Sequence, residues 1–401
     1  MISLANIKQF IGNGLFLLLI MVIILDPSNT ILHMKDKFFV LLVGFCMLVY
    51  KPDFKYLIHI SLIFSSVLSC FVFAEMQGNH IDMDKFVAVL KAFSPLVLLL
   101  WIKNFDVVKL SIFPSFMACV MIFVMYFFAV SSEELEYAMY LFFVKHDEFV
   151  MMGRRYFFGI QFFGLYLKSF VDLMFTLFLV FFYTFNSQRT RNKIFFAALM
   201  VVFSLTFFIS NTRSTMLLPI VMFCFVSYAS VMKRSKMKYY VYPVLVLFTV
   251  LFLAFVFVLA TEKGEMSNAI KYSHLSSYIK LFTENPEYLL WGQGPATMFY
   301  SEGFRRMTME TEWTYIELIR VYGVFSLLIL SVVFFPVYRL WRFAKKDTFS
   351  FGIWGTYIIY LFIAGTNPLI LSSTGMIMIL AIYSYLEQAK LRFPEWNETK
   401  L

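Results

Sequence analysis

Long apolar runs separated by short polar clusters repeat along the whole chain, and most are close to the length of one membrane crossing. A helix needs about 20 apolar residues, with a range of about 17–25, to cross the hydrocarbon core of a bilayer. The pattern therefore predicts an all-α, polytopic membrane protein of about 12 transmembrane helices, in a single domain over residues 1–401. The predicted spans lie near residues 10–25, 38–50, 56–74, 86–101, 110–130, 162–185, 194–210, 214–232, 239–260, 313–337, 351–365 and 369–386.

Composition excludes a soluble globular domain. The chain is 61% hydrophobic and 15% charged, with a mean hydropathy of +0.77, whereas soluble domains are about 45–50% apolar and about 25% charged. A disordered chain is excluded for the same reason. The 52 Phe and 24 Met suit a surface that faces lipid.

The distribution of lysine and arginine predicts the orientation. The short loops after the second, fourth, sixth, eighth and tenth predicted spans are basic, as with Arg189, Arg191 and Lys193 after the sixth. Short basic loops stay cytoplasmic, so both termini are expected inside, with the protein in a bacterial inner membrane. Anionic lipid headgroups account for the net charge of +9 without a nucleic-acid partner.

Two longer polar segments, about residues 131–161 and 261–312, are expected on the opposite, periplasmic face. The second is the larger and lies between the ninth and tenth predicted spans. Because no soluble enzyme domain is attached, any active site must lie in these segments and the helix ends beneath them. The four Cys lie inside apolar runs and no two His have ligand spacing, so neither a metal nor a cofactor is expected.

Arginines near the outer face are the first candidates for binding an anion. Arg213 lies in a short link between two predicted spans, and an Arg at a bilayer edge costs a few kcal/mol unless it is paired or reaches water. Its planar fork suits phosphate oxygens, but the same residue also fits a turn whose Arg extends to a headgroup. Arg154 and Arg155, in the first outer segment, contact a phosphate or only flank the interface.

A turn is predicted near the end of the second outer segment. Gly292, Gly294 and Pro295 form a Gly-x-Gly-Pro sequence that favours a tight reversal of the backbone. It is not a dinucleotide-binding fingerprint, because the third glycine and the preceding strand are missing.

Charged residues follow this turn and precede the tenth predicted span. Arg305 and Arg306 are paired cations, and Glu310 and Glu312 are carboxylates just before the helix expected near Trp313. Acids at a helix N-terminus are favoured by the helix dipole, which is the simpler explanation. The same group also suits the binding of an anionic donor together with general-base catalysis.

Two further charge pairs occur inside predicted spans. Lys168 and Asp172 are four residues apart, and Glu317 and Arg320 are three apart. At these spacings the side chains of a helix meet, so each pair is expected to neutralise itself.

The segment 291–330 resembles the signature region of the O-antigen polymerase and O-antigen ligase superfamily. The resemblance rests on Gly292-Gln-Gly-Pro295, followed by Glu312-Trp-Thr-Tyr-Ile-Glu-Leu-Ile-Arg-Val-Tyr-Gly323. Asn211-Thr-Arg-Ser214 is similar to the Thr/Ser-x-Arg element that the family has between two mid-chain spans. The resemblance covers most of the chain in topology but only about fifty residues in motif.

The resemblance implies an integral-membrane glycosyltransferase that joins oligosaccharides carried on undecaprenyl diphosphate at the periplasmic face. In the ligase branch, the position eleven residues before the glycine that matches Gly323 is typically His followed by Asn. Here it is Glu312 followed by Trp313, which favours a polymerase of O-antigen or a related surface polysaccharide. A ligase, a peptidoglycan glycosyltransferase and a lipid or solute transporter remain alternatives.

On this reading the donor is a growing glycan on undecaprenyl diphosphate and the acceptor is one lipid-linked repeat unit. Glu312, or else Glu310, takes the proton of the acceptor hydroxyl. Arg213, with Arg305 or Arg306, holds the donor diphosphate, and no divalent metal is required. A polysaccharide chain-length regulator is an expected partner.

Overall fold

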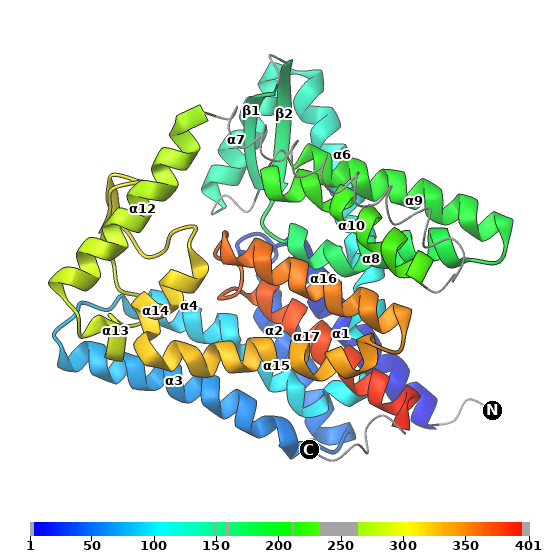
Figure 1. Ribbon diagram of the computed structural model, residues 1–401, viewed down its shortest axis with the longest axis horizontal. Helices are drawn as coiled ribbons and strands as arrows, with labels where there is room; N and C mark the ends of the chain where they lie inside the picture. The colour runs from blue at the N-terminus through cyan, green and yellow to red at the C-terminus, as the bar shows by residue number, and fades with distance from the viewer. Residues whose placement is uncertain (1–3, 147–149, 158–159, 211, 233–263, 395–401) are drawn as a thin grey trace.

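The computed structural model describes residues 4–146, 150–157, 160–210, 212–232 and 264–394, and this part of the chain is mostly helical (Figure 1). It also contains two antiparallel two-stranded hairpins. The predicted span 239–260 lies outside the described residues.

Seven helical segments of the described chain are long and apolar enough to cross a membrane. Only 17% of the apolar window in residues 190–209 is buried, so most of that surface is left for lipid. The helices in these segments are α1 (Leu4–Leu25), η1 (Phe54–Tyr56) with α3 (Leu57–Met76), α4 (Met83–Phe93) with η2 (Ser94–Asn104), α5 (Val107–Leu110) with α6 (Ile112–Ser131), α9 (Thr190–Ile209), α14 (Thr314–Tyr322) with η4 (Gly323–Phe325) and α15 (Ser326–Ala344), and α16 (Thr348–Gly365).

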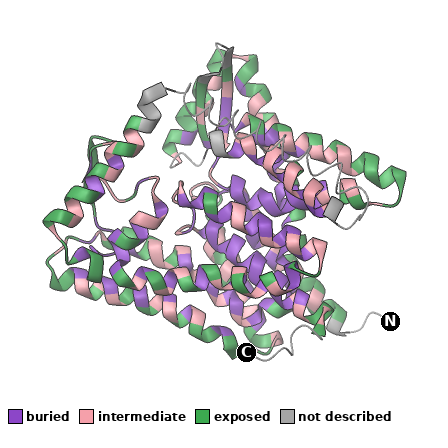
Figure 2. Ribbon diagram, viewed as in Figure 1, coloured by how far each residue is buried: buried purple, intermediate pink, exposed green. Residues whose placement is uncertain are grey.

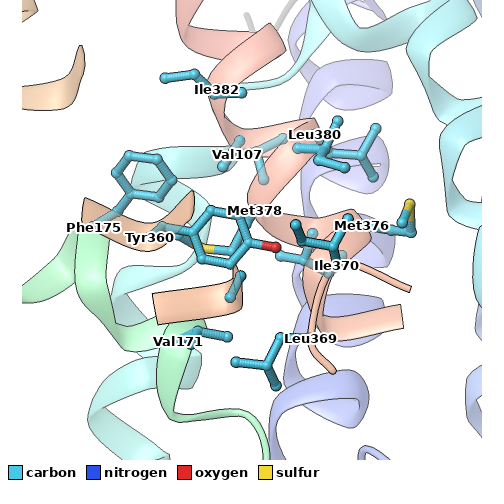
Figure 3. Close-up of a cluster of buried hydrophobic side chains, with 14 of the residues drawn as sticks. Val107, Val171, Phe175, Tyr360, Leu369, Ile370, Met376, Met378, Leu380 and Ile382 are labelled. Carbon is cyan, nitrogen blue, oxygen red and sulfur yellow. The ribbon is translucent and has the colours of Figure 1, made fainter. Parts of the chain in front are cut away.

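The core of the molecule is built around α17 (Ser373–Arg392), which is buried along almost its whole length. Figure 2 shows buried residues concentrated in α16 and α17, and the surrounding helices are more exposed on their outer sides. Tyr360 of α16 lies at the centre of a buried cluster with Phe175, Ile370 and Met378 (Figure 3). The remaining helices of this region are α2 (Lys35–Val49), η3 (Phe170–Leu173) with α8 (Met174–Asn186), and α10 (Arg213–Met232); α8 and α10 pack against α16, and η3 packs against α17.

The prediction of one helical span over residues 162–185 is wrong in its first part. Residues 160–167 form strand β2 (Ile160–Leu167), which pairs with β1 (Val150–Phe157) so that Gly153 lies opposite Gly164. An aromatic-rich apolar run suits a strand as well as a helix, and helical structure begins only at Phe170. Helix α7 (Glu133–Lys145) precedes the hairpin in the segment that was expected to be a loop.

The segment expected as the second outer loop is also folded. It contains α12 (Gly264–Glu284), α13 (Tyr288–Trp291) and a hairpin of β3 (Phe299–Ser301) and β4 (Arg306–Thr308). This segment ends directly before α14, so the hairpin is held close to the start of an apolar helix.

Candidate functional site

Two adjoining cavities lie where the second outer segment meets the core. The first chamber, of about 570 Å³, is lined by the β1–β2 hairpin, Lys168, the end of α9, residues 304–312 and residues 367–374. The second chamber, of about 670 Å³, is lined by the starts of α2 and α4, residues 306–310, part of α14 and residues 371–373. Eight described residues line both chambers, and the charged ones among them are Arg306 and Glu310, so a cation and a carboxylate lie where the two spaces meet.

Glu310 is the acid lining the chambers whose pKa is raised. Its side chain is accessible to solvent inside the chambers, but protein surrounds it on most sides, and this burial raises its pKa to about 7. The carboxylate of Glu317 raises the pKa further, whereas Lys168, Arg320 and Lys85 act in the opposite direction. A carboxyl group with a pKa near neutrality is suited to accept a proton as a general base.

Glu312 lies in the first chamber in a different setting. Its Oε2 atom is 3.1 Å from the Nζ atom of Lys271, on α12, and its side chain is 42% exposed. The ammonium group of Lys271 therefore occupies one oxygen of this carboxylate. Glu310 and Glu312 line the same chamber, but within the described part of the chain only Glu312 of the two forms an ion pair with a lysine.

The structure brings Arg306 to the site but separates Arg154 from it. Arg306 extends over the ring of Phe304, 5.7 Å from its centroid. Of the two hairpin arginines, only Arg306 is among the described residues that line the chambers; Arg305 is exposed at the turn with a φ of +53°. Arg154 forms an ion pair with Glu136 of α7 and faces shallow hollows beside that helix.

Two predicted arginines fall where side chains are not described. The backbone of Arg155 pairs with Phe162 in the β1–β2 hairpin, and α10 begins at Arg213. The side chains of both lie outside the described part of the structure, so their expected contacts with phosphate stay predictions. Thr212, next to Arg213, lines the first chamber.

A buried ion pair on α14 lies directly behind the chambers. Arg320 Nε is 3.0 Å from Glu317 Oε2, and its Nη2 is 2.5 Å from Glu317 Oε1, as their spacing predicted. Arg320 Nη1 also donates to the side-chain oxygen of Gln293 and, at 3.2 Å, to Thr297 Oγ1. A buried pair is favourable only when further hydrogen bonds satisfy it, and this one has them.

The buried pair anchors the backbone on both sides of Glu310. Arg320 Nη2 donates to the carbonyl oxygen of Met309 at 2.6 Å. The hydroxyl of Tyr278 lies 2.6 Å from Glu317 Oε2 and 2.7 Å from Thr311 Oγ1. The residues before and after Glu310 are therefore both hydrogen-bonded to the network around the Glu317–Arg320 pair.

The Gly292–Pro295 turn closes the C-terminal end of α14. The backbone N–H of Gln293 donates to the carbonyl of Arg320 at 2.6 Å, and that of Gly294 donates to Val321 at 3.1 Å. Gly292 has a φ of +77°, and a Cβ there would lie 2.3 Å from the Val321 oxygen, so a side chain is excluded. Pro295 follows the turn and lines the second chamber.

The expected pairing of Lys168 with Asp172 is not found. Asp172 is buried, and neither of its oxygens has a hydrogen-bond partner among the described residues. Lys168 precedes the first turn of η3 rather than lying in a helix, so the spacing that joins side chains four apart does not apply. Lys168 instead lines the first chamber.

Sequence reasoning missed several residues of the site. Lys35 and Lys85 line the second chamber, Lys271 pairs with Glu312, and Tyr278 joins the network behind Glu310. Lys35 and Lys85 lie in the first turns of α2 and α4, whereas Lys271 and Tyr278 lie inside α12, and none of the four belongs to a motif. Only the folded structure shows that these residues belong to the site, because they come from segments far apart in the sequence.

Among the described residues, no group of three or more His, Cys, Asp and Glu side chains is placed to hold a metal ion. Comparison with known proteins gives no match: no family model, no curated protein and no solved structure matches this chain. The function is therefore inferred from the residues of the site and from the family resemblance in the sequence.

Proposed function

We propose that the chain is a multi-pass inner-membrane glycosyltransferase that polymerises oligosaccharide repeat units linked to undecaprenyl diphosphate. The proposal includes the topology of about 12 spans with both termini cytoplasmic, and places the chambers at the periplasmic face. The observation that carries it is the position of Glu310, between two chambers that share Arg306 and contain further lysines. A reaction between two large anionic substrates needs two such spaces, joined at a base and a cation.

In the proposed reaction, Glu310 takes the proton of the acceptor hydroxyl as the acceptor oxygen bonds to the anomeric carbon of the donor. The bond from that carbon to the diphosphate oxygen breaks, and the diphosphate leaves with the electron pair. Arg306 and Lys168, both at the first chamber, stabilise its charge. The proton on Glu310 then passes to solvent.

This proposal moves the role of base from Glu312 to Glu310. Lys271 already neutralises Glu312, whereas Glu310 has a pKa raised to about 7. Arg213, whose side chain is not described, keeps its role in diphosphate binding as an expectation from the family resemblance.

The test is polymer formation by purified protein in nanodiscs supplied with lipid-linked repeat units, scored as product length on gels. Glu310→Gln keeps the shape of the side chain but cannot accept the proton, so elongation should slow by about 10²–10⁴-fold. Glu312→Gln should have a smaller effect, and Glu287→Gln, at an exposed position of the outer segment, is the matched control.

Full activity of Glu310→Gln together with loss in Glu312→Gln would return the base to Glu312. Transport of a lipid or solute by wild-type protein without any polymer would replace the glycosyltransferase proposal with the transporter alternative.

A further inference from the structure

The second chamber is lined by four basic side chains and two carboxylates, so it has an excess of positive charge. Lys35 Nζ donates to the carbonyl of Pro27 at 3.2 Å and lies 3.4 Å from Ser373 Oγ. Among the described residues, neither Lys35 nor Lys85 has a carboxylate within ion-pairing distance. Lys35 is half-buried, and an ammonium group in that setting is costly without a counter-ion unless an anion reaches it, whereas Lys85 is exposed to solvent.

The acids nearest to Lys35 are committed elsewhere. The carboxylate of Asp26 accepts backbone N–H groups from residues 30–32 at 2.7–3.1 Å. Asp36 pairs with Lys91 at 3.1 Å. Burial lowers the pKa of Lys35, although Asp36 and Asp26 act against that shift. Lys35 therefore lines the chamber with two neutral hydrogen-bond acceptors as its close partners rather than a carboxylate.

The start of α17 adds to the attraction for an anion. Leu371, Ser372 and Ser373 line the second chamber, and α17 is a 20-residue helix beginning at Ser373. The side chain of Ser372 caps the N–H of Gly375 at 3.1 Å, and the positive end of the helix dipole lies at the same terminus. This terminus reinforces the two lysines and Arg306, which are the primary observation.

One wall of the chamber is apolar and follows a helix of membrane-spanning length. Ala88, Val89 and Ala92 of α4 line it, and Lys85 lies one turn before them. At this helical spacing the four residues share one side of α4. An anionic head beside Lys85 would therefore continue into an apolar chain along the stripe.

We infer that the second chamber binds a second polyprenyl-linked substrate, with its phosphate groups held by Lys35 and Lys85 and its isoprenoid chain along Ala88, Val89 and Ala92. The inference rests on the proposed function, since it assigns the acceptor to this chamber and the donor to the first. Glu310, at the junction, then faces the acceptor hydroxyl from one side and the donor sugar from the other.

The test counts bound lipids by native mass spectrometry of the full chain in nanodiscs, with undecaprenyl diphosphate as the probe. Wild-type protein should bind two per chain, and Lys35→Gln/Lys85→Gln should bind one. Lys91→Gln, on the same helix but paired with Asp36 outside the chamber, should bind two. Lys85→Arg should restore the second site, which separates loss of charge from misfolding.

Kinetics provide a second readout. Lys85→Gln should raise the KM for the acceptor by about tenfold or more, since a hydrogen bond to a charged group is lost, while kcat changes less. Inorganic pyrophosphate, which lacks the isoprenoid chain, should compete weakly. Competition as strong as that of undecaprenyl diphosphate would make the chamber a free-anion site and overturn the lipid assignment.

The two proposals can fail separately. If the double lysine variant keeps both lipids and the wild-type acceptor KM while polymer forms, the chamber assignment is wrong and the glycosyltransferase proposal stands. If lipid binding behaves as expected but no polymer forms from any repeat unit, the lipid site stands and the polymerase proposal falls.

Discussion

Glu310 and Glu312 are two residues apart but differ in what surrounds their carboxylates. Burial and the neighbouring Glu317 raise the pKa of Glu310 to about 7, whereas Lys271 holds Glu312 in an ion pair. No local pattern in the sequence separates two acids of one short segment. The distinction comes from Lys271 and Glu317, which approach from α12 and α14.

The pKa of Glu310 predicts how the reaction depends on pH. A raised pKa means that the carboxyl holds its proton up to about pH 7, and only the deprotonated form is a base. Initial rates of elongation should therefore rise with pH through about 7 and level off above it. Lys85→Gln removes a cation that lowers this pKa, so its profile should move to higher pH.

The measurement is the initial rate of polymer formation in nanodiscs across this pH range, with Lys91→Gln as the control that keeps the wild-type midpoint. A rate that does not change with pH around 7, or a midpoint near that of an ordinary glutamate, would remove Glu310 from the role of base.

At the scale of elements, helix α14 connects the Gly292–Pro295 turn to the segment that contains Glu310, through the buried Glu317–Arg320 pair. Glu317 and Arg320 are both buried, so Arg320→Gln leaves an unpaired carboxylate in the interior. Loss of one partner of a buried pair costs about 3–5 kcal/mol, and the thermal unfolding midpoint in detergent should fall accordingly. Glu317→Gln/Arg320→Gln should be more stable than Arg320→Gln alone, because no charge is left unpaired.

The matched control is the exposed pair Asp106 and Lys109, which has the same spacing and an N–O distance of 2.8 Å. Lys109→Gln should cost about 0–1 kcal/mol. Equal losses for Lys109→Gln and Arg320→Gln would contradict the view that the α14 pair is the anchor of the site.

Helices and strands could be predicted where a short stretch of sequence alone indicates them. The helices α3, α9 and α16 were expected because each is a continuous apolar run of membrane-spanning length. The β1–β2 hairpin was not, because its second strand merges with the apolar run of α8. Gly153 and Gly164 lie opposite each other in this hairpin, but nothing in the sequence around them predicts that they pair.

At the scale of the whole molecule, the chambers could not be predicted because they join residues far apart in the chain. Lys35 meets Ser373, and Glu310 lies near Lys85 and Lys168. Helical periodicity relates only residues a few positions apart. Glu310, Glu312 and Arg306 were candidates from the sequence alone. Lys35 and Lys85 join the site only because α2 and α4 pack beside it.

Helix α17 runs from the chambers to a cluster of basic residues near its other end. It begins at the chambers with Ser373, and near its other end Glu387 contacts Lys55 and Lys390, both at 2.6 Å. A helix of 20 residues is about 30 Å long, the thickness of a bilayer core. Glu387 lies 14 residues after Ser373, about 21 Å along the helix at 1.5 Å per residue, so the basic residues are at the opposite end of α17 from the chambers, in agreement with the proposed sidedness.

This arrangement predicts which positions a membrane-impermeant maleimide reaches in intact spheroplasts. Cys46, Cys70 and Cys119 are buried, so a Cys224→Ser background should give little labelling. Glu287→Cys, in the exposed outer segment, should be labelled from outside, whereas Lys345→Cys, exposed at the end of α15, should react only after the membrane is opened. Both sites are solvent-exposed, so a difference between them reports the side of the membrane rather than burial. The reverse pattern would place the chambers in the cytoplasm, where a periplasmic polymerase could not work.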